Sequence, residues 1–142
     1  MKTGIEIITA ERARQAAPKA EGGESWSAKH DATHVCGELA CAASCYAMAA
    51  HAKIYAAKNG RIVDMAKIMP PPQWPWAPEW WKMSNDPIRM LAKAGALIAA
   101  EIDRLQDAER CPYHATIGDT VTNFRCLLPA GHEGDHQYEA AK

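Results

Sequence analysis

The sequence predicts a mainly α-helical protein: a small antiparallel helical bundle followed by a small C-terminal module rich in cysteine and histidine. Two observations carry this prediction. Alanine-rich segments are bounded by helix start and stop signals, and five Cys and His residues gather near the end of the chain. A length of 142 residues suits one ordinary domain with an appendage. We therefore expect a helical bundle domain over residues 1–109 and a Cys/His module over residues 110–142.

The first two predicted helices lie in the N-terminal half of the chain. Residues 5–17 are rich in Ala, Glu, Arg and Gln, and Pro18 should end the helix that they form. Residues 31–58 should form one long helix, because the pair Asn59-Gly60 that follows is a common helix stop signal.

A loop rich in proline and tryptophan separates these helices from the third. Five prolines within residues 70–83 exclude both a regular helix and a central strand. The same segment holds four tryptophans, and the chain has a single Phe to supply bulk elsewhere. We expect the loop to fold over the bundle and complete its core, although indole rings can also form a binding platform. These tryptophans are Trp74, Trp76, Trp80 and Trp81.

The third predicted helix starts at Pro87 and ends near Arg110. Asp86 offers a capping side chain, and proline is favoured at the first helical position. Most large apolar residues of the helix share one face, which we expect to pack into the bundle. They are Ile88, Leu91, Leu97, Ile98, Ile102 and Leu105.

Composition excludes several classes of function. The formal net charge of −1 argues against non-specific binding to nucleic acid or to an acidic membrane surface. No apolar run approaches the roughly 18–20 residues that span a bilayer, and the N-terminus does not resemble a signal peptide. The five cysteines are an odd number, and Cys36, Cys41 and Cys45 fall in an alanine-rich stretch as small core residues. We expect a soluble, cytoplasmic protein.

The C-terminal Cys and His residues have the spacing of a metal site. Thiolate and imidazole are ligands that zinc prefers, and a structural site needs four of them. The module has few apolar side chains, so a metal would supply free energy that folding otherwise lacks. We predict Zn²⁺ bound by Cys111, Cys126, His132 and His136, with His114 as the alternate ligand.

The predicted zinc site is structural, because this full set of ligands leaves no open position for a catalytic water. A nucleic-acid finger is disfavoured, since the module has one fixed positive charge, Arg125, between residues 111 and 138.

A second cluster lies at the start of the predicted long helix. Asp31, His34 and Glu38 would share one helical stripe at about 100° per residue. We expect them at the rim of a pocket for a divalent metal or a phosphate-bearing ligand, with Trp74 and Trp76 completing the ligand surface. The alternative is helix-start chemistry, in which Asp31 caps the helix, Glu38 is solvated and His34 makes an ordinary hydrogen bond.

Over roughly residues 5–107, the chain resembles a widespread family of small phage and prophage proteins, which implies an accessory or early phage gene. The C-terminal module resembles a zinc-binding appendage of actinobacterial and actinophage proteins, through the segment Arg125-Cys126 to Gly134-Asp135-His136. The phage resemblance is carried by Glu11-Arg12-x-Arg14-Gln15, Trp26, His30-Asp31-x-x-His34-x-x-Gly37-Glu38-Leu39-Ala40, Trp74-Pro75-Trp76, Trp80-Trp81-Lys82 and the segment from Leu91 to Leu105.

A weaker similarity runs to the all-α nucleotide pyrophosphohydrolases of MazG type. Their phage members share the Glu-Arg-x-Arg-Gln-like helix, a Trp and a His-rich turn before an acidic helix. Those enzymes use two acidic motifs to hold Mg²⁺ against a triphosphate. This chain departs from the pattern, because Glu38 is followed at i+3 by Cys41 and Asp86 by Arg89.

The expected function is therefore non-catalytic binding by a phage accessory protein in the cytoplasm of the host cell. The partner would be a small nucleotide-like ligand or a host protein, and the phage setting suggests an anti-defence role such as sequestering a nucleotide signal. Two alternatives remain open. One is Mg²⁺-dependent nucleotide pyrophosphohydrolysis, and the other is a protein–protein adaptor that uses the Trp-rich loop.

Overall fold

A computed structural model describes residues 1–18, 26–109, 114–116, 123–126 and 138–140; from residue 110 on, only the backbone of strands is described. The chain divides into two compact units, Met1–Ile102 and Asp103–Lys142. We call them the helical unit and the C-terminal unit and describe each by itself. The boundary between the units lies after Ile102, in the last turns of the third long helix, whereas the sequence suggested a boundary after residue 109.

Helix α1 (Gly4–Ala16) begins and ends within one residue of the prediction. Thr3 and Glu6 form a reciprocal capping box at its start: the Thr3 amide donates to the Glu6 carboxylate at 2.6 Å, and the Glu6 amide donates to Thr3 Oγ1 at 3.3 Å. Pro18 lies just beyond its last residues, as expected.

The single helix predicted over residues 31–58 is wrong. The segment forms a one-turn helix α2 (Ala28–Asp31), a turn, and then the long helix α3 (Glu38–Lys58). Gly37 causes the break, because its φ of +80° is the left-handed conformation that only glycine adopts at little cost. Asp31, His34 and Glu38 therefore do not share a helical stripe. The C-terminal end of α3 at Asn59-Gly60 is as predicted.

The proline-rich segment contains no long helix or strand. It holds one one-turn 3₁₀ helix, η2 (Pro78–Trp80), and a similar turn, η1 (Met65–Lys67), precedes it. Helix α4 (Pro87–Ala108) then starts at the predicted proline. The Asp86 carboxylate caps it by accepting a hydrogen bond from the Ile88 amide at 2.9 Å.

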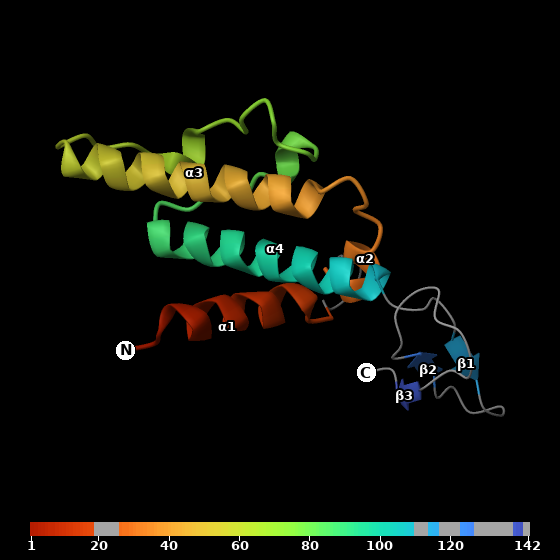
Figure 1. Cartoon of the computed structure of the whole chain (residues 1–142). Helices are drawn as coiled ribbons and strands as arrows, with labels where there is room; N and C mark the ends of the chain where they lie inside the picture. Colours follow the sequence, from red (N-terminus) through yellow and green to blue (C-terminus); the bar gives the residue numbers. More distant parts are fainter. Residues whose placement is uncertain (19–25, 110–113, 117–122, 127–137, 141–142) are drawn as a thin grey trace. The chain divides into compact units, whose positions relative to one another are not determined.

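The three long helices of the helical unit lie side by side with α4 in the middle (Figure 1), and α3 runs antiparallel to the other two. Gly95 is where α1 meets α4: a Cβ at this position would lie 2.6 Å from the Cδ1 of Ile8. A glycine is needed there because the Ile8 side chain occupies the space of a larger residue. The mainly helical bundle expected from the sequence is therefore present.

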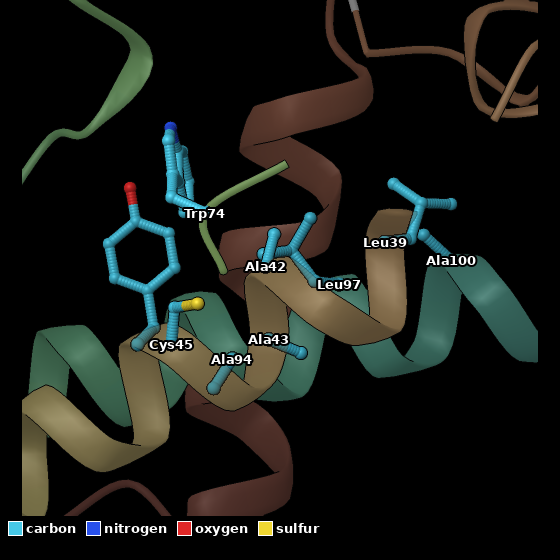
Figure 2. Close-up of a cluster of buried hydrophobic side chains, with 9 residues drawn as sticks. Leu39, Ala42, Ala43, Cys45, Trp74, Ala94, Leu97 and Ala100 are labelled. Carbon is cyan, nitrogen blue, oxygen red and sulfur yellow. The ribbon is translucent and has the colours of Figure 1, made fainter. Parts of the chain in front are cut away.

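The main core lies between α3 and α4 and is built mostly from small residues (Figure 2). Trp74 reaches it from the proline-rich loop and is 8% exposed, so this part of the loop completes the core as predicted. Cys45 is buried there, whereas Cys36 is exposed in the turn before α3, so the core position predicted for Cys36 is wrong. The other buried members are Leu39, Ala42, Ala43, Tyr46, Ala94, Leu97 and Ala100.

The prediction of which face of α4 packs into the bundle is wrong for every predicted residue except Leu97. Ile88, Leu91 and Ile98 are 58%, 45% and 50% exposed, whereas the buried face carries alanines together with Met90 and Leu97. The reason is that α4 lies between two helices, and small residues let their backbones approach closely. No helix in the described ranges is long and apolar enough to cross a membrane.

The C-terminal unit contains a three-stranded antiparallel sheet in the order β1 (His114–Thr116), β2 (Asn123–Cys126), β3 (Tyr138–Ala140). His114 pairs with Arg125, and Cys126 pairs with Tyr138. The start of β1, the end of β2 and the start of β3 therefore lie at the same end of the sheet.

Candidate functional site

Asp31 ties the first helices of the unit together. Its side chain is buried, and its Oδ2 accepts a hydrogen bond from Arg12 Nη2 of α1 at 2.6 Å. Arg12 also donates to the carbonyl oxygen of Trp26 at 3.2 Å. A buried carboxylate paired in this way holds α1, Trp26 and α2 in place, so the contribution of Asp31 to a ligand surface would be indirect.

His34 lies in the turn between α2 and α3 and is surrounded by charged groups from three elements. Burial is the main cause that lowers its pKa, and the nearby His30 lowers it further. The negative charges of Glu38, Asp31 and Glu101 act in the opposite direction and raise the pKa of the ring. The imidazole is therefore neutral at pH 7 and can either donate or accept a hydrogen bond.

Glu101 is a member of this cluster that the sequence reasoning missed. It comes from α4, 8% exposed, far along the chain from Glu38 at the first turn of α3. A signal was present, because Glu101 follows Leu97 at i+4 and so continues the buried stripe of α4 as a carboxylate. The sequence could not show that the charge of Glu101 acts on His34.

Five rings line an open cavity of about 180 Å³ that includes His34. The His34 ring lies 4.9 Å from the His30 ring and 5.2 Å from the Trp76 ring, measured between centroids. Trp26 stacks on His30 at 5.7 Å and meets Trp76 edge to face at 5.4 Å. We call this space the ring cavity; it is lined by Trp26, His30, His34, Trp76, Ala77 and Trp80.

The predicted ligand residues thus separate into two groups. His34 and Trp76 line the ring cavity, and Glu38 lies near it. Trp74 lies in the core, where its ring contacts Tyr46 at 5.5 Å and Trp81 at 4.8 Å. Trp26, His30 and Trp80 complete the cavity, and periodicity did not single them out because they come from two separate segments, one around the start of α2 and the other at the end of η2.

Several buried polar atoms at the ring cavity have no hydrogen-bond partner among the described residues. Three belong to residues that line the cavity: the Nε1 of Trp76, a donor, the Nε2 of His34 and the Nδ1 of His30. Asp31 Oδ1 is also without a partner and lies 3.8 Å from His30 Nδ1. A buried polar group left unpaired costs about 1–3 kcal/mol, so hydrogen bonds from a ligand would be favourable here.

No three His, Cys, Asp or Glu side chains converge as a metal site within the part of the chain that the structure describes. The predicted zinc ligands Cys111, His132 and His136 lie outside the described residues. His114 begins β1 and Cys126 ends β2, at the same end of the sheet, but their side chains are not described. The chemistry of this donor set, thiolate and imidazole, suits Zn²⁺.

Comparison of the chain with protein-family models, with curated proteins and with solved structures found no match. The functional inference therefore depends on the geometry and chemistry of the site itself.

Proposed function

We propose that the helical unit binds a small ligand through a flat heteroaromatic ring of the kind found in nucleotides, without catalysing its turnover. One observation carries the proposal: the ring cavity combines indole faces from Trp26, Trp76 and Trp80 with the unpaired nitrogens of Trp76 and His34. Stacking on indole is favourable for any base, by about 1–3 kcal/mol per base. The two nitrogens would then form hydrogen bonds with the donors and acceptors on the edge of the ring.

The charges around the cavity favour a neutral ring over a cationic guest. An aromatic cage for a quaternary ammonium group gains from a carboxylate beside the rings. None of the described residues that line the cavity carries a carboxylate, Asp31 behind it is already paired with Arg12 at 2.6 Å, and the two histidines of the lining are hydrogen-bonding groups. A nucleobase offers both donors and acceptors on its edge and so suits this lining better.

The biological setting is part of the same proposal. The resemblance to phage and prophage proteins implies an accessory role during infection, in the cytoplasm of the host cell. A protein that binds a nucleotide without consuming it would lower the free concentration of that nucleotide. If the nucleotide is a signal of host defence, its sequestration would be an anti-defence role.

Titration with free nucleosides tests ring binding, with tryptophan fluorescence as the readout. We expect at least one nucleoside to quench the fluorescence saturably, and Trp76→Phe to weaken its binding about tenfold because the indole N–H is lost. Trp81→Phe is the matched control, since the Nε1 of Trp81 donates to the Ile68 carbonyl outside the cavity. If no nucleoside binds at millimolar concentrations, the proposal is wrong.

A second candidate function has one observation in its favour. The negative charge of Glu101, from α4, acts on His34 together with those of Glu38 and Asp31, so a second helix contributes a carboxylate that the two acidic motifs of the sequence did not include. Mg²⁺ is often held by one or two carboxylates together with substrate phosphates, as nucleotide pyrophosphohydrolysis would require. Incubation with dNTPs and Mg²⁺ separates the two candidates: pyrophosphate release that is lost in Glu101→Gln and in Glu38→Ala would overturn the non-catalytic proposal.

For the C-terminal unit we propose a structural Zn²⁺ site formed by Cys111, Cys126, His132 and His136. The sheet register supports it, because the strand ends next to these residues in sequence lie at one end of the sheet. The metal would stabilise a segment with few apolar residues.

A further inference from the structure

A second cavity of about 170 Å³ lies in the helical unit and has a different lining from the ring cavity. It shares Trp26 and Trp80 with the ring cavity, so the two spaces are neighbours. Its polar lining comes from α1, from the end of the Trp-rich loop and from α4. The charged residues are Glu11, Arg14, Lys82 and Lys93.

Lys93 is the buried cation of this cavity. It is 9% exposed, and its ammonium group donates a hydrogen bond to the carbonyl oxygen of Lys82 and lies 5.2 Å from the centroid of the Tyr46 ring. The ion pairs found among the described residues do not include Lys93. A buried ammonium group without a bound anion is unusual, because desolvation disfavours its charge.

Among the described residues of the lining, the one carboxylate is already engaged. Glu11 accepts two hydrogen bonds from Arg14, at 2.8 and 2.7 Å, and a third from Gln15 at 3.1 Å. The charges of Glu11 and Arg14 cancel, so Lys82 and Lys93 leave the cavity with a net positive charge. An anion that enters would pair with Lys93 in a partly desolvated space, where such a pair is stronger than at an exposed surface.

The protonation of Lys93 is compatible with anion binding at neutral pH. Burial, together with the positive charge of Arg89, lowers the pKa of Lys93 to about 8, while Glu11 acts in the opposite direction. The amine is therefore still mostly protonated at pH 7 and loses its charge as the pH rises through about 8.

We infer that this second cavity binds the phosphate group of the ligand whose ring occupies the ring cavity, with Lys93 as the main contact and Lys82 as a second cation. The inference rests on the proposed function for the identity of the ligand, but the cavity itself is separate. Gln15 indicates a further group that the ligand should carry, because the buried Oε1 of this side chain has no hydrogen-bond partner among the described residues. It can accept a hydrogen bond from a sugar hydroxyl or a protonated phosphate oxygen.

Inorganic pyrophosphate, which has no ring, tests the phosphate site independently of the ring site. We would follow the Lys93 ammonium resonance by lysine side-chain NMR during pH titrations with and without pyrophosphate. A bound anion favours the charged amine, so we expect the pKa of Lys93 to rise by at least one pH unit above about 8. We also expect pyrophosphate affinity to fall as the pH rises from 7 to 9, because Lys93 loses its charge over this range. The other charged or titratable groups nearby are Glu11, Arg14, Arg89, Lys82 and Tyr46.

Two variants give a matched comparison. Lys93→Met should weaken pyrophosphate binding at least tenfold, whereas Lys67→Met, which removes an exposed lysine side chain outside the cavity, should leave it unchanged. The wild-type titration needs no variant, so the test holds even if Lys93→Met folds poorly.

The possible outcomes are distinct. No change in the Lys93 titration with pyrophosphate, or an equal change with acetate, would overturn the phosphate site. If nucleosides bind and pyrophosphate does not, this inference fails while the proposed function stands. If pyrophosphate binds through Lys93 and no nucleoside binds, the anion site stands and the ring proposal fails.

Discussion

The helical unit and the C-terminal unit are stabilised in different ways. The helical unit buries its own side chains, with Trp74, Leu97 and Met90 among alanines, and it adds a buried ion pair between Arg12 and Asp31. The strands of the C-terminal unit are three or four residues long, and the surrounding sequence has few large apolar residues. Short strands alone are marginal, so the second unit needs another source of stability, for which we propose zinc.

This difference bears on where function lies. The two neighbouring cavities, the unpaired buried nitrogens and the buried lysine all belong to the helical unit. For the C-terminal unit we propose only the structural metal. The comparison predicts that each unit can be destabilised without the other, and the following changes test this in order of decreasing expected effect.

The largest expected effect is that of Cys126→Ser on the C-terminal unit. Loss of a thiolate ligand should release Zn²⁺ and unfold β1, β2 and β3, because the binding free energy of a structural metal is also folding free energy. Zinc content by mass spectrometry and amide exchange of the strand residues would measure both effects. Cys36→Ser, which changes an exposed cysteine of the helical unit, is the control. A mutant that keeps its zinc and its strands would contradict the ligand assignment.

In the helical unit, Trp74→Ala should have the largest effect on stability. Removing this buried side chain should lower the free energy of unfolding by about 3–5 kcal/mol, because a cavity is left between α3 and the loop. Urea unfolding followed by circular dichroism measures it. Trp80→Ala is the matched control and should cost much less, since Trp80 is 37% exposed. Zinc content should not change; equal effects of the two substitutions would argue against a core role for Trp74.

Asp31→Ala should destabilise the same unit by about 2–4 kcal/mol. The reason is that Arg12, whose side chain is 19% exposed, would lose the carboxylate that it meets at 2.6 Å. Urea unfolding again gives the measurement. In Lys67→Met, which breaks the exposed Lys67–Asp64 pair, a change below about 1 kcal/mol is expected. If the two variants are equally stable, the Arg12–Asp31 pair does not hold α1 against α2.

The smallest predicted effect is a pH dependence that Lys93 confers on the helical unit. Its pKa is lowered to about 8 in the folded protein, while an unfolded lysine titrates near 10.4. Between these values the unfolded state binds more protons, so stability should rise with pH, by roughly 1–2 kcal/mol after allowance for solvent screening. Unfolding of the wild type and of Lys93→Met at pH 7, 8, 9 and 10 tests the sign. A parallel dependence in both proteins would exclude Lys93 as its source.

Local signals in the sequence were sufficient for most of the helical boundaries. Pro18, Asn59-Gly60 and Asp86-Pro87 act on the backbone within a few residues, so α1, the end of α3 and the start of α4 were predicted closely. The error at α2 has the same local origin. The helix predicted over residues 31–58 ran through Gly37, whereas the chain uses the freedom of this glycine to adopt a positive φ and make a turn.

The candidate site was only partly predictable. His34, Glu38 and Trp76 stood out by residue type, and they do lie in or near one cavity with His30. The reason given for them, a shared helical stripe, was wrong. Trp26 joins them from just before α2, and Glu101, whose charge acts on His34, comes from a segment far away in sequence; no periodicity within one helix can reveal such an arrangement.

The sequence by itself determined which segments are helical, where proline excludes helix and which residue types are available for a site. Only the tertiary structure decided which face of α4 is buried. Because α4 lies between α1 and α3, its alanines pack inward and its isoleucines remain exposed, contrary to what hydrophobicity alone predicts. The same packing buries Lys93 and Glu101. Lysine and glutamate usually lie at the surface, so their burial makes these two residues candidates for a site. Burial depends on which elements meet, and that is set by long-range contacts between complementary surfaces.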